Sequence, residues 1–375
     1  MKIEHRSWID DAWDQPLPDL DSPTTLVLAF GAPGRAAPSP PLNDLVAAYP
    51  QSAVVGCSTA GEIHGTTIRD DSVSVAVVRF DKTRVRTASA SVAGAQDSQL
   101  AGKQIAAELE ASDLAAMLVL SEGLHVNGTE LVAGINDVVD PSVVVTGGLA
   151  GDGDRFDETW VLADGTTESH RIVAVGLYGD QVEVGHGSKG GWDIFGPERI
   201  VTRSQGNVLY ELDGQPALQL YRDYLGELAD GLPATGLLFP LAIREPGDDE
   251  RALVRTILGI DEATNSLTFA GDIPQGHHAQ LMQANFDRLV GGAEEAALHA
   301  TDADAEDLLV VAISCVGRRL VLGERAEEEI EATMDVLPVG AVQVGFYSYG
   351  ELSPHANGRC DLHNQTMTLT TIAEV

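Results

Sequence analysis

The stretch VVGCSTAGEI at residues 54–63 decides the expected fold, because its pattern returns twice along the chain. In each copy an apolar strand and a glycine precede a few small or polar residues, then glycine and an acid; the others are VVTGGLAGDG (144–153) and VQVGFYSYGEL (342–352). Glycine lets the backbone approach closely at a strand end. Such ends commonly bind small molecules in α/β proteins. We expect three comparable strand ends, each a binding loop or a tight turn whose acid caps the next element.

Around these copies, apolar and alternating segments predict strands interleaved with helices. SVSVAVVRF (72–80) and TRVRTASASV (83–92) are expected to form an antiparallel hairpin. Asn127, with Glu130 three residues later, indicates the start of a helix that runs through Val139. Further strands are expected at 24–30, 52–56, 116–122, 143–147, 172–178, 181–187, 236–243, 252–260, 266–270, 308–315 and 341–349, a hairpin at 201–214, and helices at 215–228, 279–292 and 324–336.

A glycine-rich segment, GHGSKGGWDIFGPERI (185–200), is the best candidate for a domain boundary. We therefore expect an N-terminal extension over residues 1–23, one domain over 24–200 and another over 201–375. A chain of 375 residues is long enough to bury two cores. The predicted fold class is α/β (α+β), with two domains of similar size whose mixed or antiparallel sheets are covered by helices.

The composition excludes several classes of function. The chain carries 57 acidic and 23 basic residues, a net charge of −34, which would repel nucleic acid and anionic lipid. The acid excess fits either a salt-rich cytoplasm, that of a halophile, or an ordinary acidic bias that favours solubility. No apolar run is long enough to span a bilayer, and the first residues lack the apolar core of a signal peptide. We therefore expect a cytoplasmic protein that engages neither nucleic acid nor membrane.

The segment CDLHNQTMTL (360–369) gathers polar side chains directly ahead of an alternating strand. Pro354 and Gly358 suit a reversal of direction before it, so we expect a hairpin that sets an acid opposite an imidazole. The prediction places Glu351, Cys360, His363 and Asn364 close together. This cluster is either one wall of a ligand pocket or a structural sheet edge.

Several of these stretches resemble the FIST family. VVGCSTAGEI, SVSVAVVRF and GGLAGDG are similar to the family's N-terminal part. ELDGQPALQLYRDYLG and the ending FYSYGELSP…CDLHNQTMTLT are similar to its C-terminal part. The resemblance extends from about residue 24 to the C-terminus.

The resemblance implies an intracellular sensory module of prokaryotic signal transduction that binds a small ligand, amino acids being one class. Because the similar stretches leave no room for an output segment, we expect a standalone protein that acts through a separate partner, such as a histidine kinase, a cyclase or a chemoreceptor. A subset of the family resembles haem-containing nitric-oxide sensors, which leaves non-covalent haem binding as an alternative. No cofactor is otherwise expected.

Other chemistries have weaker support in the sequence. Cys57 lies at a strand end with His64 seven residues on, but no G-x-S-x-G elbow accompanies them, so a Cys-dependent hydrolase or transferase is the less favoured alternative to a simple buried cysteine. Cys360 and His363 form half of a zinc-type spacing without a second pair, so no metal site is expected. If haem binds, His363 is the expected ligand, with His277 or His278 as alternatives.

We therefore predict a binding protein and not an enzyme. Glu62, Asp152 and Glu351 are expected to take an ammonium group, while amides beside the glycines take a carboxylate or carbonyl. Tyr349 supplies an aromatic wall. The expected ligand-binding residues are Gly56, Cys57, Ser58, Thr59, Gly61, Glu62, Asp152, Tyr349, Glu351, Cys360, His363, Asn364 and Thr366.

Overall fold

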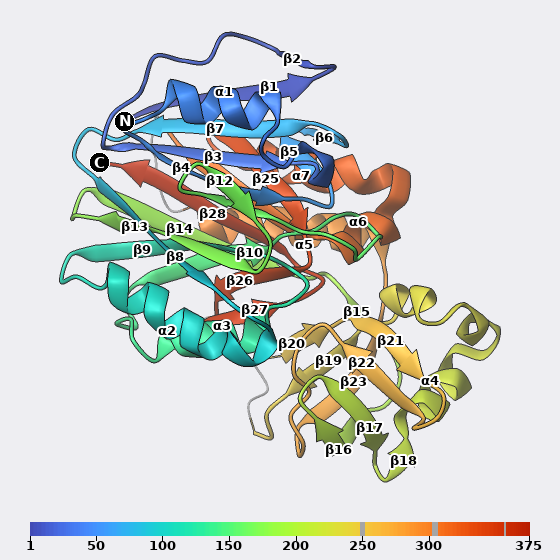
Figure 1. Ribbon diagram of the computed structural model, residues 1–375. Coiled ribbons are helices and arrows are strands. Elements are labelled where there is room, and N and C mark those ends of the chain that lie inside the picture. The colour runs from blue at the N-terminus through green and yellow to red at the C-terminus, as the bar shows by residue number, and fades with distance from the viewer. Residues whose placement is uncertain (248–251, 302–306, 356–357) are drawn as a thin grey trace.

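The computed structural model describes residues 1–247, 252–301, 307–355 and 358–375. A larger body contains both ends of the chain, and a smaller lobe is formed by the segment from Asp193 to Gln283 (Figure 1). The two termini lie beside each other, and the Met1 ammonium is 3.6 Å from the Glu374 carboxylate. Within the described residues the strands form four sheets, three in the body and one in the lobe.

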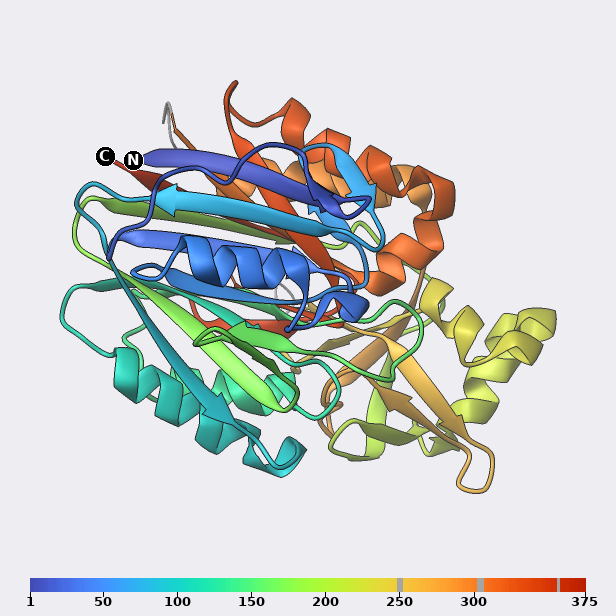
Figure 2. The same cartoon turned by 45° about the horizontal axis from the view of Figure 1, so that its top comes forward.

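The first sheet lies at the N-terminal side of the body, and α1 (Pro40–Ala48) lies across it (Figure 2). Its central strand is β3 (Thr25–Gly31), whose alternate residues face two different cores. Leu28 packs toward the other body sheets, and Val27 packs toward α1. In spatial order its strands are β12 (Thr166–Glu168), β11 (Val161–Ala163), β4 (Ala53–Ser58), β3 (Thr25–Gly31), β7 (Val73–Arg79), β1 (Lys2–Ile9) and β2 (Ala12–Trp13). The expected N-terminal extension therefore contributes β1, paired with β7.

The second and third sheets combine strands from both halves of the chain. The second contains β27 (Cys360–His363), β26 (Gly350–Pro354), β10 (Val144–Leu149), β9 (Leu114–Ser121), β13 (Arg171–Tyr178) and β8 (Arg84–Ser91). The third contains β14 (Val182–Lys189), β28 (Met367–Glu374), β24 (Leu309–Cys315), β25 (Val342–Ser348), β5 (Glu62–His64) and β6 (Thr67–Arg69). Pairing of β10 with β26 and of β5 with β25 thus joins segments on either side of the expected domain boundary.

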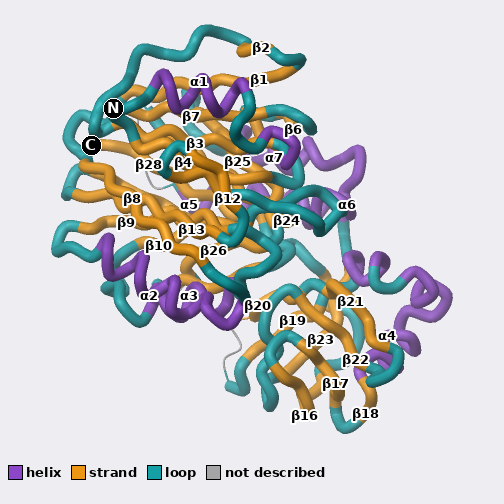
Figure 3. Tube along the Cα trace, viewed as in Figure 1, coloured by secondary structure: helices purple, strands orange, loops and turns teal. Residues whose placement is uncertain are grey.

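Helices lie at the margins of the stacked body strands (Figure 3). The second sheet packs with α2 (Ser98–Leu109) and α3 (Gly128–Asn136), and the third with α5 (Phe286–Ala300), α6 (Val316–Leu322) and α7 (Ala326–Asp335). Asn127 caps α3 as predicted, since its side-chain oxygen accepts the Thr129 and Glu130 amides at 3.0 and 3.2 Å. Short 3-10 turns occupy Pro33–Arg35, Ala95–Asp97 and Gly323–Arg325.

The lobe has its own sheet and its own apolar cluster. The sheet order is β20 (Ala252–Arg255), β19 (Leu241–Arg244), β23 (His278–Gln283), β16 (Arg199–Gln205), β17 (Val208–Leu212), β22 (Ser266–Phe269) and β21 (Ile257–Asp261), with β15 (Asp193–Ile194) on β23 and β18 (Gln215–Pro216) on β17. Tyr221 of α4 (Ala217–Leu225) packs against this sheet, and 3-10 turns follow at Gly226–Gly231 and Ala234–Leu238.

The predicted α/β (α+β) class with mixed or antiparallel sheets is confirmed, although the body and the lobe are unequal in size where similar sizes were expected. The following local predictions are wrong. Segments 72–80 and 83–92 do not pair: β7 stays in the first sheet, and β8 joins β13 in the second. The Glu374 carboxylate accepts the backbone N–H groups of residues 81, 82 and 83, which holds the chain where it crosses between sheets. The helix expected at 279–292 begins only at Phe286, because Ala279 and Leu281 alternate into the lobe core as part of β23.

In the part of the chain that the structure describes, no helix combines the length and the apolar character needed to cross a membrane.

A buried ion pair holds the body at the place where the chain enters and leaves the lobe. The Arg318 guanidinium donates to the Glu329 carboxylate at 2.7 and 2.9 Å, and neither side chain is exposed. The hydroxyl groups of Ser314 and Tyr347 donate to the other carboxylate oxygen at 2.9 and 2.8 Å. Arg318 also donates to the carbonyls of Gly190, just before the lobe, and Leu289, just after it. Every charged group in this cluster is therefore compensated.

We predict that Glu329→Ala lowers the free energy of unfolding by about 3–5 kcal/mol, because it leaves the Arg318 charge buried and uncompensated. Chemical denaturation followed by circular dichroism measures the change. Glu331→Ala, on the exposed side of the same helix, is the matched control and should change stability by about 0.5 kcal/mol or less. Equal effects of the two substitutions would contradict the assigned role.

Candidate functional site

The three repeated strand ends meet in the body. The Gly151 amide donates to the Ser58 carbonyl at 3.1 Å, which joins the loops after β10 and β4. The Ala60 amide donates to the Tyr347 carbonyl at 2.8 Å, and the Tyr347 amide donates to the Gly61 carbonyl at 2.9 Å. The repeated pattern therefore marks strand ends that lie against one another.

The acids of the first two loops bond to the protein's own donors. Glu62 is 1% exposed and accepts the Ser72 amide and hydroxyl at 3.0 and 2.7 Å, as well as the Thr59 hydroxyl. Burial raises the pKa of Glu62 to about 7. Asp152 accepts the amides of the following loop, residues 156, 157 and 158, at 2.8–3.0 Å, and the Tyr349 hydroxyl. Burial favours its protonated form, but these bonds outweigh burial and lower the pKa of Asp152.

The predicted C-terminal hairpin is present, with Glu351 directly opposite His363 in the β26–β27 pair. Glu351 is fully buried and accepts the Ser348 hydroxyl at 2.6 Å and the Thr366 amide and hydroxyl at 3.2 and 2.9 Å. Burial raises the pKa of this carboxyl group to about 8. The His363 Nε2 atom bonds to the Ser353 carbonyl at 3.0 Å. Neighbouring hydroxyl and amide groups thus occupy the Glu351 oxygens.

The remaining polar residues of this segment are also inside the body. Asn364 is 1% exposed and Gln365 is fully buried, and the polar side-chain atoms of both amides lack a hydrogen-bond partner. Cys360 is buried, and its carbonyl accepts the Asn136 side chain at 2.9 Å. The cluster therefore belongs to the packed interior at the end of the second sheet.

Gly56 and Cys57 serve the packing of β4. A Cβ atom at Gly56 would lie 1.9 Å from the Ala29 carbonyl oxygen of β3, so the close pairing of these strands requires glycine. Cys57 is fully buried in the apolar core, and burial raises the pKa of its thiol well above the usual value. A thiol kept protonated in this way is a poor nucleophile.

The candidate haem ligands lie in different places. His363 and Thr366 line a cavity of about 670 Å³ that is also lined by His186, His299 and His355 of the body and by Ala252 and Val254 of the lobe. His277 borders a separate cavity of about 220 Å³, and His278 bonds to Glu198 at 2.5 Å. Across the described ranges, no three His, Cys, Asp or Glu residues are grouped so that they could hold a metal ion.

A different pocket, of about 290 Å³, also lies between the body and the lobe. Tyr349 and Val316 line it from the body, and Thr256, Leu258 and Phe269 line it from the lobe. Of the residues expected to bind ligand, Tyr349 reaches this interlobe pocket. Pockets of this kind, concave and mostly apolar at the junction of two units, are the usual small-molecule sites of proteins.

Two polar contacts close the seam beside the interlobe pocket. Arg255, which is 2% exposed, donates to the Leu362 carbonyl of β27 at 3.0 Å, and the Asn127 side chain donates to the Asp272 carboxylate at 3.3 Å. Burial lowers the pKa of Arg255 to about 10. In Figure 1, β20 accordingly lies beside α3 and β27.

A short loop brings a second aromatic ring to the pocket. Phe156 lies on the pocket wall, 49% exposed, and its ring stacks on that of Tyr349 with centroids 4.6 Å apart and planes 12° from parallel. Its backbone has φ of +52°, a strained value for a bulky residue. The three amides accepted by Asp152 hold the loop in this conformation.

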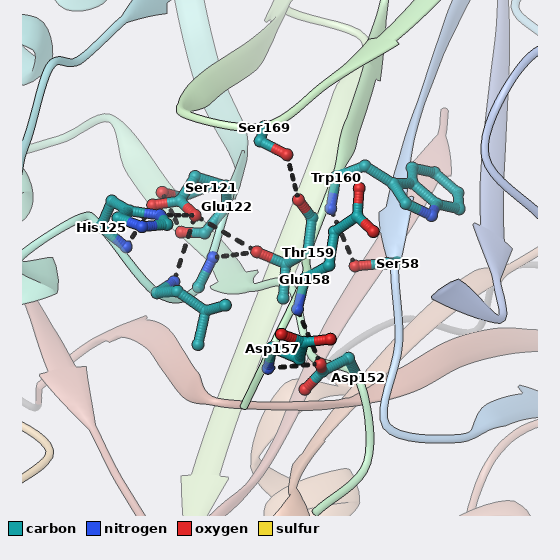
Figure 4. Close-up of polar contacts among 12 residues, drawn as sticks. Ser58, Ser121, Glu122, His125, Asp152, Asp157, Glu158, Thr159, Trp160 and Ser169 are labelled. Atoms are coloured by element: carbon teal, nitrogen blue, oxygen red, sulfur yellow. Dashed lines mark hydrogen bonds and ion pairs between the residues drawn. The ribbon is translucent and has the colours of Figure 1, made fainter. Parts of the chain in front are cut away.

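Sequence reasoning missed Glu122, which is fully buried at the end of β9 (Figure 4). Its carboxylate accepts the amides of residues 124 and 125 and the Thr159 hydroxyl at 3.2 Å. Trp160 follows Thr159 directly, and its amide donates to the Ser58 hydroxyl at 3.1 Å. The sequence signal that could have identified Glu122 is the Ser-Glu-Gly at residues 121–123, directly after an apolar strand. This signal differs from the repeated pattern because the acid comes before the glycine. Arg255, Phe156 and Arg318 carried no comparable local signal.

Comparison with known proteins assigns the family. The model of the FIST N domain matches residues 25–215, and the model of the FIST C domain matches residues 217–354. The chain therefore belongs to the FIST family, whose domains are sensory modules of signal transduction. The interlobe pocket is lined by residues from both matched regions.

The curated relatives carry no function in their names. An uncharacterised protein of Mycobacterium bovis is 27% identical over 251 residues, which is 62% of this chain and 61% of that protein. One from Mycobacterium tuberculosis is 29% identical over 246 residues, 62% of each chain. One from Methanocaldococcus jannaschii is 25% identical over 311 residues, 72% of this chain and 56% of that protein. The chain thus spans about six tenths of the length of these relatives.

The raised pKa of Glu351 predicts a pH dependence of stability. A carboxyl group whose pKa is higher in the folded protein favours folding below its unfolded pKa, near 4.5, and this contribution is lost as the pH rises to about 8. Glu351→Gln keeps a neutral group of the same shape, so we expect the variant to match the parent near pH 5 and to be more stable near pH 9 by roughly a few kcal/mol. Melting temperatures across this range measure the difference, and parallel curves for the two proteins would contradict it.

Proposed function

We propose that this protein is a sensor that binds a small molecule in the interlobe pocket and passes the binding event to a separate signalling partner. The observation that carries the proposal is the pocket itself, with walls from both matched domains and a mostly apolar lining. The absence of a ready nucleophile at the buried Cys57 supports a binding role over a hydrolytic one.

The position of the pocket suggests how binding would be transmitted. A ligand that contacts Tyr349 on one side and Leu258 on the other stabilises the arrangement of body and lobe in which both contacts exist. The seam contacts, from Arg255 to Leu362 and from Asn127 to Asp272, would respond to the same movement. The signal would then be a change in the position of the lobe, read by a histidine kinase, a cyclase or a chemoreceptor.

We predict that Leu258→Asp abolishes binding of small molecules that stabilise the parent protein, because it places a charge at the apolar pocket wall. A thermal-shift screen identifies such molecules, and isothermal titration then measures their affinity for the variant. Leu228→Asp is the matched control: both leucines are in the lobe and are similarly exposed, 45% and 49%, but Leu228 is not on the pocket lining. Molecules that bind the Leu258→Asp variant with unchanged affinity would exclude this pocket as the site.

Haem-based sensing is a second candidate, favoured by the histidine-lined cavity of about 670 Å³. The His363 Nε2 atom would have to release the Ser353 carbonyl before it could bind iron, so His186 and His299 are the better-suited imidazoles in that cavity. A bound haem would supply an iron for a diatomic gas. An absorption spectrum after haem-replete expression tests this candidate: an intense Soret band supports it, and a colourless protein excludes it.

A further inference from the structure

The lining of the interlobe pocket contains no charged side chain among the described residues. This is unusual in a chain with 21% charged residues and a net charge of −34. The nearby acids are already bonded: Asp152 holds its loop and Tyr349, and Asp272 accepts Asn127. Burying an uncompensated charge costs several kcal/mol, so a charged ligand would meet a large desolvation penalty here.

One polar group in the pocket lacks a partner. Thr256 is 4% exposed, and its hydroxyl oxygen is buried without any hydrogen bond. An unsatisfied buried hydroxyl costs about 1–3 kcal/mol, so its place on a pocket wall points to a partner supplied from outside the chain.

Among the described lining residues, the side chains of the two asparagines and of the tyrosine are occupied. Asn127 caps α3 and donates to Asp272, and the Asn207 side chain donates to the Phe269 carbonyl at 2.8 Å. The Tyr349 hydroxyl donates to Asp152. Cys315, the remaining polar group, is a weak donor whose pKa is raised by burial. Of the pocket residues that the structure describes, Thr256 is therefore the one whose strong hydrogen-bonding side chain remains available to a ligand.

We propose that the interlobe pocket selects an uncharged, predominantly apolar molecule of about two rings that exchanges a hydrogen bond with the Thr256 hydroxyl. This inference rests on the proposed function and names the ligand class of that same site. A cavity of about 150 Å³ holds benzene, so a volume of about 290 Å³ fits roughly two rings. A free amino acid does not suit this pocket, since both of its charges would be desolvated without a partner.

The stacked rings of Phe156 and Tyr349 support the same ligand class. Phe156 lines the pocket and keeps about half of its surface exposed, although its backbone is strained. A residue that only filled the core would need neither the exposure nor the strain. An exposed, pre-positioned ring such as that of Phe156 suits a flat apolar ligand because stacking adds about 0.5–1.5 kcal/mol beyond buried area.

The test uses two probes that share a ring system and differ in charge, 2-naphthol and 2-naphthoate, titrated by fluorescence at pH 7 into the full chain. We expect 2-naphthol to bind and 2-naphthoate to bind at least tenfold more weakly. Thr256→Val keeps the shape and removes the hydroxyl, and it should weaken 2-naphthol binding about three- to tenfold. Thr268→Val, on the neighbouring strand β22 and absent from the pocket lining, should leave it unchanged.

The melting temperature without probe is a second measurement. Thr256→Val should melt at or above the parent temperature, because the variant removes an unsatisfied buried hydroxyl. Tighter binding of 2-naphthoate, or equal 2-naphthol affinity in Thr256→Val and the parent, would overturn the inference. If 2-naphthol fails to bind while tryptophan binds in a manner sensitive to Leu258→Asp, the inference is wrong and the proposed function stands. If no molecule shows binding that depends on Leu258, both fail.

Discussion

The buried pair of Arg318 and Glu329 is the interaction on which the arrangement of body and lobe depends. Burying two charges is expensive, and a buried pair is maintained only where every donor and acceptor is satisfied. Here the guanidinium completes its bonds with the carbonyls of Gly190 and Leu289, where the chain leaves for the lobe and where it returns. One residue of α6 thus fixes both crossings, and with them the walls of the interlobe pocket.

The three repeated strand ends show how a very acidic chain uses its acids internally. Glu62, Asp152 and Glu351 bond to nearby amides and hydroxyl groups, and Glu122 does the same at a fourth strand end. Through these contacts the carboxylates hold loops in position. One of these loops carries Phe156. The polarity concentrated at the strand ends therefore supports the architecture, whereas the neighbouring pocket is lined by apolar and uncharged groups.

The local sequence pattern predicted the structure correctly wherever contacts between residues close in sequence determine it. The Asn127 cap, the β26–β27 hairpin and the continuous apolar strands were all predictable, since each depends on residues within about a dozen positions. The β7–β8 hairpin failed because pairing with β3 and β13 was available to these strands, and no short-range signal reports on such distant partners. The helix expected at 279–292 failed in its first part because an alternating segment also suits a strand.

For the candidate site, the sequence by itself identified the family and the mixed α/β character, and it singled out Tyr349 as an aromatic wall. It also located the strand ends that meet. Only the tertiary structure decided which polar residues face a pocket, because a carboxylate at a strand end can equally accept an internal amide or an external ligand. Thr256, Leu258 and Phe269 come to lie near Tyr349 through the docking of the lobe on the body. That docking depends on long-range packing and on the contacts of the buried Arg318. Neither can be predicted from a local sequence pattern.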